Sequence, residues 1–199
     1  VEADAGLAVI CVGATDARGP RRQIGLAMRA AMALEAFLPL GAPTEPGRLA
    51  DAVAGAEERV IMALERLRGQ SELVLSLEAP AAAGFAPHIQ GTGGRAWLRA
   101  RRARRQADIE ARARMAWAAE AVAEALGHPW SLAYGVADRA LDVTLLVPRA
   151  LAVSTALEAE RRLGRADGAG AHLVSGPWPC FAFGASLAAP WLGREEDVA

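Results

Sequence analysis

The longest helical pattern in the sequence is the feature that most restricts its fold. Residues 95–126 contain no proline or glycine, and the pattern ends at Gly127 and Pro129. In the second half of this segment Met115, Val122 and Leu126 share one face, so we expect that half to pack on a core. The first half is charged almost all round. The fold must therefore provide a core for one half of a long helix and leave the other half in solvent.

Alternating apolar residues on both sides of the long helix predict β-strands. Leucines recur at every second position of residues 72–78, and apolar residues do so in 141–147. Residues 130–137 and 171–176 predict two further strands. An apolar run at residues 6–14 predicts a buried strand near the N-terminus.

Three more helices are predicted by apolar residues at spacings of three and four, over residues 24–38, 49–67 and 149–163. Pro148 is placed to end a strand and start the last of them, in which Val153, Ala156, Leu157 and Leu163 are expected to face inward. Short strands mixed with helices, without strict βαβ alternation, predict the α+β class.

A stretch without periodicity, rich in Pro, Gly and Ala, separates the two halves of the chain at residues 79–94. We place a domain boundary there. The expected organisation is an N-terminal α+β domain at residues 1–90 and a C-terminal α+β domain at residues 91–199. The second is expected to form a modified ferredoxin-like sheet with the long helix against it.

Charge and composition exclude several classes of function. The net charge is −1 and the pI is near 6.4, which gives no reason to expect binding to nucleic acid or to an acidic membrane. No segment reaches the roughly 20 apolar residues of a membrane-spanning helix. The acidic start does not resemble a signal peptide. Cys11 and Cys180 lie far apart, and we expect both to be reduced in a cytoplasmic protein.

Arginine is concentrated in the first half of the long helix, within "GRAWLRARRARRQADIEARAR". We interpret this segment as a solvated helix face with intramolecular ion pairs. A surface for a protein partner is the alternative, and phosphate binding is the least favoured one, because Trp97 and Trp117 are too far apart for a stacking ladder.

Few residues in the sequence suggest catalysis. His88, His128 and His172 lack metal-ligand spacing, and "GTGG" at 91–94 lacks the Lys of a phosphate-binding loop, so no metal and no cofactor is expected. Cys180 is the one candidate nucleophile. Its apolar neighbours in "WPCF" favour a buried, inert thiol, which makes it a structural residue.

The segment "SGPWPCFAFG" at 175–184 brings large aromatic residues between prolines. Each proline biases the residue before it toward extended geometry, so we expect a rigid strand end from Gly176 to Pro179. Such a segment holds aromatic side chains in fixed places, either in the core or on a contact surface. The candidate partner-binding residues are Pro177, Trp178, Pro179, Phe181 and Phe183.

Four segments together resemble the GvpL/GvpF gas vesicle proteins, over most of the chain from about Phe37 onward. "SGPWPCFAF" is similar to the family's "GPWPPYSF" signature, "LDVTLLVPR" to a strand ending in "YLVPR", and "GGRAWLRARR" to the "G-R-x-Y-L" opening of its long helix. The block from "FLPL" to "ELVLSLE" is similar to "LPLRFG…L…LERLxGxxEWxLxV". Cys180 and Phe181 replace a Pro and a Tyr of the signature, and Gly41-Ala42-Pro43 replaces Arg-Phe-Gly.

The resemblance implies a non-enzymatic accessory protein, cytoplasmic and associated with the gas vesicle. Such a protein would bind the hydrophobic shell subunit and other accessory gas vesicle proteins, and would assist nucleation or assembly of the vesicle. Two alternatives come from the residues themselves. One is a small hydrolase or transferase that uses Cys180. The other is a ligand-binding regulatory α+β domain that uses the loop "GFAPHIQGTGG" at 84–94.

Overall fold

A computed structural model of the chain describes residues 31–34, 36, 38, 53–79, 94–134 and 140–188. The chain divides into two compact units that interleave along the sequence. The first comprises residues 1–72, 148–150 and 177–199, and the second comprises residues 73–147 and 151–176.

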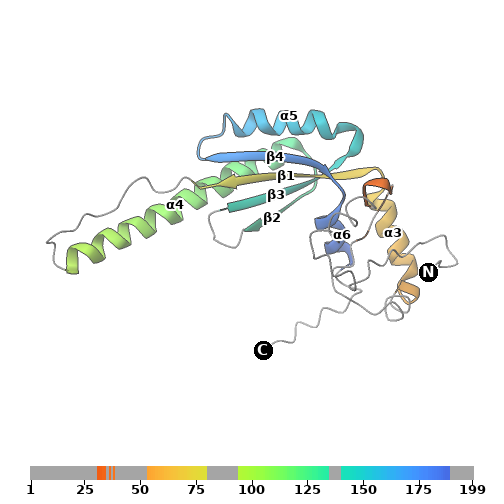
Figure 1. The fold of residues 1–199 in the computed structure, drawn as a ribbon, viewed down its shortest axis with the longest axis horizontal. Coiled ribbons are helices and arrows are strands. Elements are labelled where there is room, and N and C mark those ends of the chain that lie inside the picture. Colours follow the sequence, from red (N-terminus) through yellow and green to blue (C-terminus); the bar gives the residue numbers. More distant parts are fainter. Residues whose placement is uncertain are drawn as a thin grey trace, which may run out of the picture. The chain divides into compact units, whose positions relative to one another are not determined.

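The second unit is built on a four-stranded antiparallel sheet (Figure 1). Its strands are β1 (Gln70–Glu78), β2 (Trp130–Tyr134), β3 (Ala140–Pro148) and β4 (Ala171–Trp178), in the order β2-β3-β1-β4. Helix α4 (Gly94–Leu126) connects β1 to β2, and α5 (Ala152–Leu163) connects β3 to β4. This order of elements and strands is the split βαβ arrangement of ferredoxin-like folds, which confirms the predicted α+β class.

Alternation along the two central strands creates the core. The inward side chains of β1 and β3 are fully buried; they are Leu73, Leu75, Leu77, Leu141, Val143, Leu145 and Val147. Strand β2 pairs with β3 in antiparallel register, with Leu132 opposite Val143. From the helices, the core takes Met115, Ala119 and Val122 of α4 and Ala159 and Leu163 of α5. Because all these residues form one cluster, both helices cover the same face of the sheet.

The predicted inward face of α5 was wrong for two residues. Val153 and Leu157 are 68% and 65% exposed, while Ala152, Thr155, Ala159 and Leu163 are buried. The buried residues are mostly small, so the helix backbone can approach the sheet and α4 closely. Ala156, also expected inward, is partly buried against the core.

Helices α3 (Glu57–Leu67) and α6 (Phe181–Ala188) belong to the first unit and contact each other. Val60, Ala63 and Leu67 form the buried face of α3. The helix ends at Leu67, and the turn after it contains Gly69, whose φ of +68° is a conformation that favours glycine. The carbonyl of Gly69 accepts a hydrogen bond of 2.8 Å from the N–H of Arg149.

Several expectations fall outside the described residues. The predicted strand at 6–14 and most of the helix at 24–38 and of the segment 79–94 belong to this group, although residues 31–33 are helical. The domain boundary between residues 90 and 91 also lies there, and it stays a prediction. The two compact units contain segments from both sides of it.

We predict that cutting the chain at an engineered protease site between residues 80 and 93 leaves two fragments that stay associated. Strand β1 lies before this site, yet it pairs between β3 and β4, so a fragment beginning near Arg95 lacks an interior strand of the sheet. Gel filtration of the cut protein should show one species, which separates in denaturant. Two independently folded fragments in native buffer would contradict this and support the boundary at 90/91 as a division between autonomous domains.

Candidate functional site

The aromatic segment that the sequence singles out forms the transition from β4 to α6. Trp178 is the last residue of β4 and is 39% exposed, and Pro177 before it is exposed. Pro179 is buried, and Phe181 and Phe183 in the first turn of α6 are half-buried. Of the five candidate residues, Pro177 and Trp178 are thus at the surface, while Pro179 belongs to the interior.

The extended geometry expected here is confirmed only as far as Trp178. Phe181 and Phe183 lie in a helix rather than on a strand end. The sequence before this helix is Pro-Cys, which lacks the Ser, Thr, Asp or Asn that normally accepts hydrogen bonds from the first N–H groups of a helix. No local signal for a helix start was therefore present.

A carboxylate from a distant part of the chain supplies the missing cap. Glu72 Oε1 accepts a hydrogen bond of 2.7 Å from the N–H of Phe183, and Oε2 accepts one of 3.1 Å from the N–H of Ala182. The next N–H, of Gly184, already bonds to the carbonyl of Cys180 at 3.1 Å. Glu72 thus pairs the first N–H groups of α6 and places negative charge at the positive end of the helix dipole.

Glu72 is 3% exposed, which is unusual for a carboxyl group. Burial raises its pKa from the ordinary value of 4.5, and the N–H groups of α6 partly oppose that rise. Sequence reasoning missed Glu72, because alternation with Leu73, Leu75 and Leu77 places it on the opposite, nominally solvated face of the strand. The one available signal was its place in the "LERLxGxxEW" block.

Cys180 is a free, buried thiol next to this carboxylate. Burial raises its pKa to about 12, the Glu72 carboxylate adds to the rise, and Arg149 acts against it. A thiol with such a pKa is protonated at neutral pH and is a poor nucleophile. The structural interpretation of Cys180 agrees with this geometry, and the alternative of a Cys180-dependent hydrolase or transferase has no support from it.

Three of the sequence segments that carried the family resemblance meet around this cap. Glu72 comes from the block that ends in "ELVLSLE", Arg149 from "LVPR", and Cys180 with α6 from "GPWPCFAF". All of them belong to the first compact unit. The resemblance therefore rests on residues that interact, although they are about 30 to 110 positions apart in the chain.

The residues that the structure describes contain no candidate metal site. No group of three His, Cys, Asp or Glu side chains could hold a metal ion there. His172 lies on the edge strand β4, with Nδ1 3.4 Å from the carbonyl of Gly170 and Nε2 3.5 Å from a carboxylate oxygen of Glu160. Both ring nitrogens of His172 thus lie near an oxygen atom of the chain. The loop "GFAPHIQGTGG" lies outside the described residues except for Gly94.

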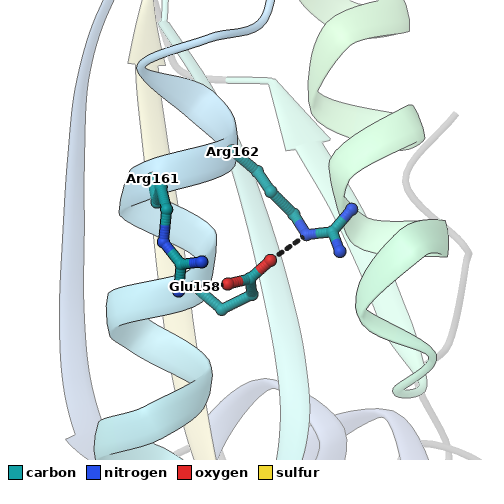
Figure 2. Close-up of polar contacts among 3 residues, drawn as sticks. All are labelled: Glu158, Arg161 and Arg162. Atoms are coloured by element: carbon teal, nitrogen blue, oxygen red, sulfur yellow. Dashed lines mark hydrogen bonds and ion pairs between the residues drawn. The ribbon is translucent and has the colours of Figure 1, made fainter.

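An open groove of about 610 Å³ lies between α4 and α5. Trp117 and Val122 line it from α4, and Glu158, Arg161 and Arg165 are among the residues that line it from α5 and the turn beyond. Figure 2 shows that Glu158 sits between two arginines, with Arg162 Nε 2.6 Å from its Oε1 and Arg161 paired with the other oxygen. These exposed ion pairs within one helix add little stability and show no catalytic arrangement.

We predict that Glu72→Gln removes a pH-dependent part of the stability. Because burial raises the pKa of folded Glu72, the folded protein retains a proton that the unfolded chain releases near pH 4.5. The free energy of unfolding of the wild type should therefore fall, relative to Glu72→Gln, as the pH rises from about 4.5 through the raised pKa, and stay level above it. Urea unfolding from pH 4 to 8 measures this. Glu78→Gln, at the exposed end of the same strand, is the control for loss of a carboxyl, and a pH-independent difference for Glu72→Gln would contradict the prediction.

We also predict that Cys180 resists alkylation in the folded protein. In a Cys11→Ser background, iodoacetamide at pH 7 should modify Cys180 on the order of 100-fold or more slowly than the same thiol in denaturant, because burial suppresses both access and the thiolate. Mass spectrometry of timed samples gives the two rates. Fast modification of the folded protein would reopen the nucleophile hypothesis.

Comparison with known proteins gives one informative result. No known protein-family model matches the sequence, and no curated protein matches it. A similar solved structure is the crystal structure of the gas vesicle protein GvpF from Anabaena sp. PCC7120. The TM-score is 0.65 at 8% sequence identity, and the similarity covers 87% of this chain and 81% of that chain.

The described residues include no helix long and apolar enough to cross a membrane. Because the sequence identity is only 8%, the structural comparison supports a shared fold and nothing more specific. This similarity of fold agrees with the resemblance of the four sequence segments. The chain therefore has the fold of the gas vesicle protein GvpF.

Proposed function

We propose that the chain is an accessory gas vesicle protein that binds the hydrophobic shell subunit and assists nucleation or assembly of the vesicle. The observation that carries the proposal is the GvpF-like fold together with the position of the signature segment. That segment, with its exposed tryptophan, lies at the junction of β4 and α6. The proposed place of action is on the gas vesicle or in the cytoplasm beside it.

The chemistry of the junction suits such a partner. A shell subunit has apolar surface that must be covered before assembly, and exposed aromatic side chains are the anchors that protein interfaces favour. Trp178 offers such a side chain, and Pro177 restricts the backbone before it, so little conformational freedom is lost on binding. Phe181 and Phe183 follow on a helix whose start is held by Glu72. In this proposal Trp178 contacts the partner, and Glu72 and Pro179 keep the junction rigid.

We predict that Trp178→Ala weakens binding of the shell subunit at least tenfold. Replacing a fully buried aromatic residue by alanine lowers the free energy of unfolding by about 3–5 kcal/mol. Because Trp178 is 39% exposed, Trp178→Ala should lower it by less. Co-purification of the major shell protein with the tagged wild type and variant, alongside thermal unfolding of each, measures both quantities. Trp117→Ala, which removes a 70% exposed tryptophan from α4, is the matched control and should bind as the wild type does.

Two results would count against the proposal. Absence of shell-subunit binding by the wild type would remove the assembly role for this chain. Undiminished binding by a strongly destabilised Trp178→Ala variant would assign Trp178 to the fold instead of the interface.

A further inference from the structure

The first half of α4 extends past the sheet without packing on it (Figure 1). No residue of 94–114 is buried, whereas the second half of the helix buries Met115, Ala118, Ala119, Val122 and Ala123. Helices in proteins take most of their stability from packing. An unpacked segment of about six turns is therefore a feature that needs a physical reason.

Charge makes this segment more unusual. Residues 94–107 contain six arginines and no acidic residue, although the whole chain has a net charge of −1. Several of these arginines are three or four positions apart, as Arg95 and Arg99 or Arg101 and Arg105 are. Like charges at these spacings lie on the same side of a helix and destabilise it.

Four of the six arginines form no ion pair with another residue that the structure describes. The interpretation of intramolecular ion pairs is not supported for Arg95, Arg99, Arg102 and Arg105, which form no ion pair with another described residue. Arg101 lies over the ring of Trp97, 5.2 Å from its centre, which places a cation on an aromatic face rather than on a carboxylate. The segment thus keeps a large positive charge exposed to solvent.

We propose that residues 94–111 of α4 form a docking surface for an acidic helix of a partner protein. Opposite charge on the partner would relieve the repulsion among the arginines and supply the packing that this half of α4 lacks. This surface lies in the second compact unit, and the proposal does not depend on the role of Trp178.

The side chains of residues 94–111 determine the face of α4 on which a partner helix would pack. Small residues recur at spacings of three and four and continue the stripe that Met115, Ala118 and Val122 bury; they are Ala96, Ala100, Ala103, Ala107 and Ala111. An alanine stripe lets a second helix approach closely. Arg99 flanks it on one side, where it can pair with a carboxylate of the partner.

Two other anionic partners fit this surface less well. A helix that lies on an anionic membrane inserts a continuous face of large apolar side chains, whereas the exposed Leu98 and Ile109 of this segment have Arg102 and Arg105 between them. Binding of single-stranded nucleic acid uses open aromatic rings for stacking, whereas Arg101 occupies one face of Trp97. A membrane or a nucleic acid attracted to this surface only through its phosphate charge would not sense the alanine stripe.

The test uses the full chain and a labelled 21-residue peptide with Leu and Ala at the core positions of a heptad and Glu at the flanking positions. The matched peptide has Lys in place of Glu. Fluorescence anisotropy should show binding of the Glu peptide and at least tenfold weaker binding of the Lys peptide. Hydrogen exchange of residues 94–114 should slow when the Glu peptide is bound. A Glu peptide that binds no better than the Lys peptide would overturn the proposal.

Variants separate docking on the stripe from general charge attraction. Ala103→Gln combined with Ala107→Gln keeps the charge and the helix propensity but blocks close approach, and should weaken peptide binding at least tenfold. Ala113→Gln, at an exposed position off the stripe, should leave it unchanged. An unchanged affinity of the double variant would overturn the proposal. So would tighter binding of mixed-sequence single-stranded DNA or of vesicles containing phosphatidylglycerol than of the Glu peptide.

Discussion

The carboxylate of Glu72 holds the start of α6, and the candidate site depends on that one interaction. A helix that begins after Pro179 and Cys180 has no local side-chain acceptor for the N–H groups of Ala182 and Phe183, and a short helix with unpaired groups inside a protein is unstable. Glu72 supplies two acceptor oxygens at 2.7 and 3.1 Å from a strand more than a hundred residues earlier in the chain. The cost of burying a carboxyl group is offset by these bonds and by the helix dipole. Both half-buried phenylalanines of the signature segment owe their positions to this cap.

Much of the fold could be predicted because local sequence patterns indicate its main helices and strands. Period-two alternation in β1 and β3 and the long unbroken pattern of α4 reflect physical requirements that act on neighbours in the sequence. The start of α6 could not be predicted in this way, since its cap comes from β1. The inward face of α5 was also predicted wrongly, because large apolar residues such as Leu157 were assumed to be buried. In the structure, the close approach of α5 to the core selects small residues instead, as at Ala152 and Ala159.

The candidate site was predictable in its aromatic residues but not in what holds them. Trp178 and its neighbours stand out by composition, and Cys180 could be judged inert from its apolar surroundings. From the sequence, Glu72 could not be distinguished from the solvent-exposed acidic residues. Strand alternation shows on which face of the sheet a residue lies, but it does not show what packs on that face. Three of the segments that carried the family resemblance contribute residues to the cap, namely Glu72, Arg149 and Cys180 with α6.

The interleaving of the two compact units has a consequence for synthesis of the chain on the ribosome. The second unit has all its residues once position 176 has been made, whereas the first unit is still incomplete at that point. The first unit needs residues 177–188, and until they emerge Glu72 has none of the α6 N–H groups to accept. The segment with the exposed tryptophan is thus among the last parts of the described chain to be ordered. A premature stop after β4 has begun would yield a nearly complete sheet without the proposed contact surface.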